Sequence, residues 1–199
     1  MSPARKPAER GSARGGPPAP VPDLVSLQQF LRSLGLDPAR DPEYAETVEL
    51  AGTFLAERTA GLREEPRPLR GIPYRGRPGA VVALEGLPVY GLCPHHFVPW
   101  FGTASVRFVP ERSLCGAGSL ARVVRDLALV PRLQEDFTEA VADAIDSALK
   151  PRSVAVHVEA RHLCIEMRGV EQRARLVTEA RRGQPPEASP EGARGAGRP

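Results

Sequence analysis

The chain has 199 residues, of which 41% are hydrophobic and 26% charged, and this length accommodates one domain with a hydrophobic core. Its formal net charge is +3, but residues 1–22 hold four basic residues against one acidic residue, and residues 184–199 hold two of each, so residues 23–183 are neutral. A nucleic-acid-binding domain needs a basic folded surface, so we expect no nucleic-acid partner.

The sequence shows no feature of export or membrane insertion. No apolar run approaches the roughly 18 residues that span a bilayer, and the basic N-terminus lacks the apolar segment of a secretory signal. The three cysteines, Cys93, Cys115 and Cys164, are an odd number and cannot all pair within one chain. We therefore expect a cytoplasmic protein without a membrane segment, whose reduced thiols are available as metal ligands or nucleophiles.

Composition separates both ends of the chain from its middle. Residues 1–22 and 184–199 are rich in proline and glycine and poor in apolar side chains, so we predict disordered tails. Residues 23–78 form an N-terminal region in which apolar residues at helical spacing predict helices over 24–34 and 43–62. A proline-rich loop completes this region.

Residues 79–183 combine strand and helix patterns, which indicates an α+β domain. Alternating apolar residues and helical spacing predict three strands and two helices: strands within 80–90, 103–110 and 153–160, and helices within 120–127 and 137–148.

The last of these strands brings two chemically active side chains onto one face. In SVAVHVEARHLC the valines alternate towards the buried side, and the same period of two continues through His162 and Cys164. If the strand persists, these two side chains project together. His157 has the opposite parity and is expected at the surface.

The segment GLCPHHFVPWFG places a thiol and two imidazoles within four positions, at Cys93, His95 and His96. Zinc binds cysteine sulfur and histidine nitrogen, and C-x-x-H spacing on a turn lets two ligands reach one ion. Cys164 would complete three protein ligands and leave the fourth position open. Spacing does not decide between His95 and His96, and the spare histidine and His162 suit general acid–base catalysis.

Several separated motifs agree with one family. GLCPHHFVPWFGTASVRFVP and ARHLCIEMRGV, with GSLARVVRDLA and RLQEDFTEAVADAI between them, strongly resemble GTP cyclohydrolase I over about residues 79–183. The resemblance implies the tunnelling fold (T-fold), an antiparallel sheet backed by two helices whose subunits assemble into barrels. It also implies a toroidal homodecamer with active sites between subunits.

The resemblance further implies the chemistry. Cys93, His96 and Cys164 match zinc ligands, while His95 and His162 match residues that transfer protons. The implied reaction is zinc-dependent hydrolysis of GTP at C8 of the guanine, loss of formate, and rearrangement to 7,8-dihydroneopterin triphosphate.

Substrate contacts carry over by position. Gln134 and Glu135 match a Gln-Glu pair whose carboxylate binds the guanine edge. Arg122 and Arg168 match arginines that bind the triphosphate, a task to which guanidinium is well suited. Ser119 is also expected in this site, where the family has a phosphate-binding lysine.

The sequence departs from the family at three places. Pro94 replaces the usual glutamate, and proline fixes φ and removes an N–H. Ser119 replaces the lysine and Gly118 a serine, and ETVELAG stands where a TP-x-R motif is expected. Two alternatives therefore remain: the same zinc chemistry on another purine nucleotide, or a non-catalytic T-fold protein that assembles or regulates a partner. Cys115 has no assigned role.

Overall fold

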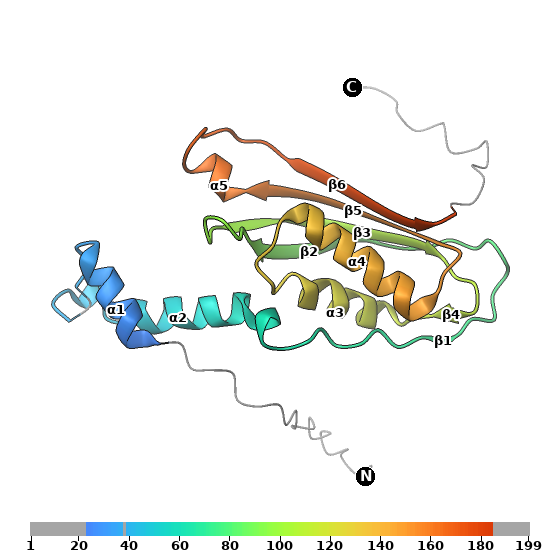
Figure 1. Cartoon of the computed structure of the whole chain (residues 1–199), viewed down its shortest axis with the longest axis horizontal. Coiled ribbons are helices and arrows are strands. Elements are labelled where there is room, and N and C mark those ends of the chain that lie inside the picture. The colour runs from blue at the N-terminus through green and yellow to red at the C-terminus, as the bar shows by residue number, and fades with distance from the viewer. Residues whose placement is uncertain (1–22, 38, 185–199) are drawn as a thin grey trace, which may run out of the picture.

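The computed structural model describes residues 23–37 and 39–184. The predicted tails lie outside these ranges, apart from Gln184, which is exposed. Within them, two helices cover one face of an antiparallel sheet, and two further helices extend from its side (Figure 1). No helix in the described ranges is both long enough and apolar enough to cross a membrane.

The sheet has four antiparallel strands in the order β2-β3-β5-β6. Their bounds are β2 Val82–Leu92, β3 Pro99–Val109, β5 Ser153–His162 and β6 Leu176–Gly183. Strands β2 and β3 form one long hairpin around the turn of residues 93–98. The register shifts between Leu84 and Leu87, where Gly86 has a φ of +69° that glycine adopts without steric cost.

Helices α3 (Ala117–Leu127) and α4 (Gln134–Leu149) pack on the sheet, α3 against β2 and α4 against β5 and β6. The core between helices and sheet contains the strand residues that were predicted to alternate inwards: Ala104, Val106, Phe108, Val154, Val156 and Val158. It also contains the apolar stripes of both helices: Leu120, Val123, Val124, Leu127, Phe137, Val141 and Ile145. The predicted α+β architecture, with two helices backing an antiparallel sheet, is confirmed.

The N-terminal arm comprises α1 (Leu24–Ser33) and α2 (Thr47–Arg58), with short 3-10 helices at Pro42–Tyr44 and Ala60–Leu62. The carboxylate of Asp23 caps α1 by accepting hydrogen bonds from two backbone N–H groups of its first turn. Helix α2 is shorter than predicted, because the sequence at both of its ends forms separate 3-10 turns. The following loop contributes β1 (Ile72–Pro73), which pairs with β4 (Ser113–Leu114).

Candidate metal centre and active site

The turn between β2 and β3 presents the first two metal-ligand candidates. The Cys93 N–H donates to the Val98 carbonyl at 3.0 Å, and the Phe97 N–H donates to the Cys93 carbonyl at 2.9 Å. Phe97 adopts a left-handed conformation, with φ of +56°, as the turn closes. Neither hydrogen bond uses the N–H of residue 94, so Pro94 fits the turn without removing a donor that the turn needs.

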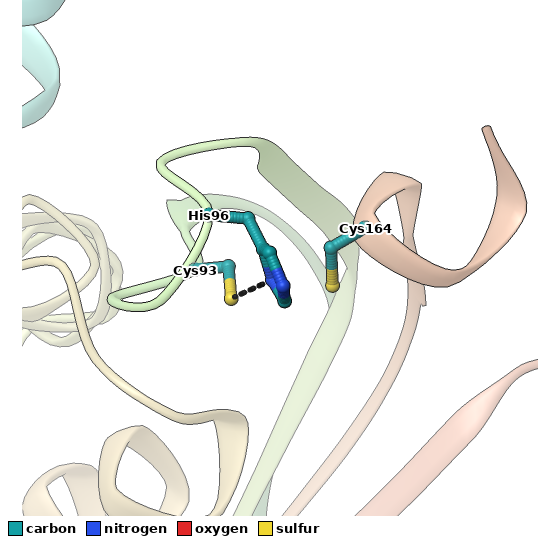
Figure 2. Close-up of side chains that lie close together, drawn as sticks. All are labelled: Cys93, His96 and Cys164. Atoms are coloured by element: carbon teal, nitrogen blue, oxygen red, sulfur yellow. Dashed lines mark hydrogen bonds between the residues drawn. The ribbon is translucent and has the colours of Figure 1, made fainter. Parts of the chain in front are cut away.

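Cys164 reaches the same point from another segment. The alternation predicted for the strand does not extend to Cys164, because β5 ends at His162 and the short helix α5 (Leu163–Glu166) follows. From α5, Cys164 points towards the β2–β3 turn (Figure 2). The sulfurs of Cys93 and Cys164 and a ring nitrogen of His96 lie within 4.8 Å of one another. Within this cluster, Cys93 Sγ is 3.5 Å from His96 Nδ1.

These three side chains fit a divalent metal ion. Burial and the neighbouring Cys93 raise the pKa of the Cys164 thiol, since two adjacent thiolates repel each other without a cation between them. Two sulfurs and one imidazole form the donor set of metal sites that keep a fourth position open. Within residues 23–37 and 39–184, no other three His, Cys, Asp or Glu side chains lie close enough to hold one ion.

His162 is held firmly at the end of β5. Its ring stacks on the indole of Trp100, its cross-strand partner in β3, with ring centroids 5.8 Å apart and an interplanar angle of 17°. Its Nε2 lies 2.8 Å from Oε1 of Gln134, the first residue of α4. Burial lowers the pKa of His162, and the negative charge of Glu135 opposes this effect only in part.

His95 lies outside the cluster, although it belongs to the same turn. In the structure His96, rather than His95, brings a ring nitrogen to the two thiols. The His95 ring is exposed, 6.1 Å from the His96 ring between centroids and inclined to it by 75°. His95 is therefore open to a substrate that approaches the cluster from solvent.

Gln134 and Glu135 begin α4 but have opposite environments. Glu135 is exposed and close enough to His162 to influence its pKa. The Gln134 side chain is 0% exposed, and its amide is hydrogen-bonded to β5 and β6. The structure thus leaves the Glu135 carboxylate accessible to solvent and buries the Gln134 amide.

The other expected substrate-binding residues occupy two separate places. Arg168 is exposed just after α5, and its positive charge acts to lower the pKa of Cys164. Near the start of α3, Arg122 Nη2 donates to Ser119 Oγ at 2.9 Å. These two residues line a cavity of about 490 Å³, the arginine pocket, together with Arg67, Pro68 and Arg70.

The arginine pocket and the metal cluster lie towards opposite ends of the sheet. Strand β3 leaves the metal turn at Pro99 and continues for 11 residues before β4 and α3 begin (Figure 1). None of the three cluster residues lines the pocket.

Comparisons with known proteins agree with this geometry. The family model described as GTP cyclohydrolase I matches residues 25–192. The chain belongs to the GTP cyclohydrolase I family. Proteins named GTP cyclohydrolase 1 that resemble it include those of Geobacillus kaustophilus, 38% identical over 79% of this chain and 85% of that protein, and Thermobifida fusca, 37% identical over 79% and 77%. The protein of that name from Streptococcus mutans is 35% identical over 79% of this chain and 83% of its own length.

Membership of the GTP cyclohydrolase I family agrees with the T-fold expected from the sequence, since the fold's antiparallel sheet backed by two helices is present here as β2, β3, β5 and β6 with α3 and α4. The family match begins at residue 25 and therefore includes the N-terminal arm. The resemblance seen in the sequence motifs covered only about residues 79–183.

Two residues near the metal cluster and the arginine pocket were not anticipated. In β3, Trp100 lies on the same face as Ala104, because an even number of residues separates them. Extending the predicted strand back to Trp100 would therefore have placed its side chain on the buried face. Its contact with His162 depends on strand register, which local pattern does not give. Arg70 stands in the proline-rich loop, where no pattern marks it.

Proposed function

We propose that this protein is a GTP cyclohydrolase I, which converts GTP and water into 7,8-dihydroneopterin triphosphate and formate. The observation that carries the proposal is the convergence of Cys93, His96 and Cys164 close to the buried His162, in a chain of this family. A non-catalytic assembly protein would have no chemical use for this set of donors.

The proposed cofactor is Zn²⁺, with Cys93, His96 and Cys164 as its ligands. When bound, it would supply Lewis-acid chemistry and lower the pKa of water, which hydrolysis at C8 of guanine requires. Proton transfers are assigned to His95 on the turn and His162 at the end of β5. Ring opening and reclosure need a proton donor and a proton acceptor, and imidazole serves as both near neutral pH.

Recognition of the guanine is assigned to Glu135. Its exposed carboxylate is able to accept hydrogen bonds from the N–H groups of the guanine edge. Gln134, the other member of the pair, is proposed to act through His162 and not by touching the substrate.

Recognition of the triphosphate is assigned to Arg168 and to Ser119, Arg122 and Arg70 of the arginine pocket. Among the described residues neither Arg70 nor Arg122 has a carboxylate partner, whereas Arg67 is paired with Asp126. The two free guanidinium groups are thus available to phosphate oxygens, and Arg70 adds positive charge where Ser119 brings none.

The active site is proposed to form between subunits of a homo-oligomer, a homodecamer by family resemblance. One chain holds the metal cluster and the arginine pocket towards opposite ends of its sheet, so a neighbouring chain is needed to bring them to one GTP. The N-terminal arm supports assembly, because its large apolar side chains are exposed: Phe30, Leu34, Leu50, Phe54 and Leu62.

The activity is tested by incubating the purified, zinc-loaded full-length protein with GTP. We expect equimolar release of formate, a product that becomes a fluorescent pterin after oxidation, and about one zinc per chain by elemental analysis. The Glu135→Gln variant should keep its zinc but bind GTP more weakly. Absence of formate with zinc-loaded wild-type protein would refute the proposal.

One observation favours a second candidate, the same chemistry on a different purine nucleotide. Ser119 brings a hydroxyl to the arginine pocket where the family uses an ammonium group, which weakens the attraction for a polyphosphate. Comparing kcat/KM for GTP, GDP and GMP separates the candidates. A preference for GTP of about tenfold or more supports triphosphate binding, while equal values would favour the second candidate.

A further inference from the structure

Gln134 lies at the centre of a buried hydrogen-bond network that joins α4 to the sheet. Its Nε2 is 3.1 Å from each of three oxygens, the carbonyls of Val158 and Leu176 and the hydroxyl of Thr178. Its Oε1 is 2.8 Å from Nε2 of His162. The side chain is 0% exposed, so the protein must satisfy both amide atoms.

The orientation of the Gln134 amide follows from the chemistry of its neighbours. The carbonyls of Val158 and Leu176 only accept hydrogen bonds, so the amide group that faces them must be the NH₂. The amide oxygen then faces His162 and also only accepts. The hydrogen bond between Gln134 and His162 therefore exists only if His162 Nε2 carries a proton.

Two threonines impose the same direction independently. The Thr138 hydroxyl donates its one hydrogen to the backbone carbonyl of Gln134 at 2.7 Å. In the 2.6 Å contact between the two hydroxyls, Thr178 must consequently be the donor and Thr138 the acceptor. The Thr178 oxygen is left to accept from Gln134 Nε2, which agrees with the orientation that the carbonyls require.

The His162 ring has little freedom to escape this arrangement. It is 9% exposed, and the indole of Trp100 covers one face. A ring flip would place a C–H group against Gln134 Oε1 and leave a buried acceptor without a partner, which is unfavourable. Nε2–H thus stays turned towards Gln134, and Nδ1 is the ring nitrogen that has no hydrogen-bond partner among the described residues.

We propose that Gln134 is a positioning residue that fixes the orientation of the His162 ring through the hydrogen bond from Nε2–H to its amide oxygen, so that Nδ1 is the ring nitrogen left to contact the substrate. The catalytic use of His162 rests on the proposed function, whereas the tautomer rests on hydrogen-bond geometry alone. The Gln-Glu pair at the start of α4 then divides its work: Glu135 faces the substrate and Gln134 orients the histidine.

The tautomer is measurable without any assay of activity. Magic-angle-spinning ¹⁵N spectra of zinc-loaded full-length protein, labelled at its histidine nitrogens, distinguish protonated from bare ring nitrogens at mildly alkaline pH. The ¹⁵N signals of exposed His95 and half-buried His157 are identified because they disappear in His95→Asn and His157→Asn. The signals of His96 are identified because they shift when zinc is removed. The remaining histidine signals belong to His162. We expect protonated Nε2 and bare Nδ1 for His162, and the reverse pattern would overturn the proposal.

Kinetics separates positioning from substrate contact. Gln134→Met keeps the side-chain length but removes the amide, so kcat should fall roughly 10- to 100-fold while KM for GTP changes less than about twofold. Its spectrum should show both tautomers of His162. The control Gln29→Met alters an exposed glutamine of α1 and should change nothing.

The outcomes are distinct. A higher KM with unchanged kcat in Gln134→Met would show direct substrate contact and overturn the proposal. If that variant does not fold, the wild-type spectrum decides. If the wild-type protein does not act on GTP, the proposed function fails, and the spectrum still tests the tautomer.

Discussion

The three cysteines of this chain have two different kinds of surroundings. Cys93 and Cys164 converge with His96, although 70 positions separate the two thiols in the sequence. Cys115 is 8% exposed in the hydrophobic core, and burial raises the pKa of its thiol. An uncharged thiol among apolar side chains behaves as a small hydrophobic residue, so Cys115 contributes to packing.

Replacing single cysteines should separate the proposed metal-ligand role of Cys164 from the packing role of Cys115. Cys164→Ala removes one of three metal ligands, so we expect zinc to be lost in dialysis against a chelator and formate release to stop. Cys115→Ala should retain zinc and activity, and should lower the free energy of unfolding by about 1 kcal/mol. Elemental analysis and urea denaturation of both variants check this, and zinc loss from Cys115→Ala would contradict it.

Pro94 should stabilise the metal turn without taking part in metal binding. Because the turn does not use the N–H of residue 94, Pro94→Ala adds only conformational freedom to the unfolded chain. We expect the free energy of unfolding to fall by about 0.4–1 kcal/mol, with the zinc content unchanged. A loss of zinc from this variant would instead show that the proline shapes the ligand geometry.

Among the elements, the proline-rich loop is tied to α3 by one ion pair. Arg67 donates from Nε and Nη2 to the two carboxylate oxygens of Asp126, at 2.7 and 2.8 Å. Burial raises the pKa of Asp126, but the hydrogen bonds from Arg67 and Arg125 outweigh this effect and hold it below its ordinary value. The pair fixes the loop beside α3 and so brings Arg70 to the arginine pocket.

The Arg67–Asp126 pair should make stability depend on pH. Because the folded pKa of Asp126 is depressed, its contribution is complete above the unfolded pKa of about 4 and is lost as pH falls through the folded pKa. Asp126→Asn should lower the free energy of unfolding by about 1–3 kcal/mol at neutral pH, and its difference from wild type should shrink below about pH 4.

Urea denaturation across pH checks this prediction. Asp146→Asn is a suitable control, because no hydrogen bond or ion pair to its side chain is found among the described residues, and it should change stability by less than about 0.5 kcal/mol. A difference between Asp126→Asn and wild type that does not vary with pH would mean that the charge of Asp126 is not responsible.

At the scale of the whole molecule, the proposed site needs more than one chain. The cluster and the arginine pocket lie towards opposite ends of one sheet, and apolar residues of the N-terminal arm are exposed. Light scattering should give a mass of about ten times the 21.4 kDa chain if the homodecamer of the family forms. A monomeric mass would contradict a shared site.

Mixed oligomers test the sharing of sites directly. Cys164→Ala alone should be inactive and Arg122→Ala alone nearly so, because each lacks one part of every site. Co-expression should restore about a quarter of wild-type activity if cluster and pocket come from different chains that mix at random. If one chain supplied both parts, the mixture would be no more active than the Arg122→Ala protein it contains.

The sequence by itself determined most of the elements that form the core, although β6 was not predicted. Periods of two and 3.6 located three strands and both core helices, because burial of one face leaves a repeating apolar pattern. The segment CPHH, with a second cysteine near a histidine, indicated a metal site. Local pattern placed Cys164 on a strand, and this was wrong because the chain turns into α5 after His162.

Only the tertiary structure decided how these side chains face one another. Trp100 covers His162, and Gln134 is turned inwards to hold it. His96 meets the two thiols, as the family resemblance implied but spacing alone did not. Each of these contacts joins segments through strand register or through the packing of α4 on the sheet. Periodicity reports whether a side chain is buried, but a hydrogen bond between distant residues depends on distance and direction, which exist only once the chain is folded.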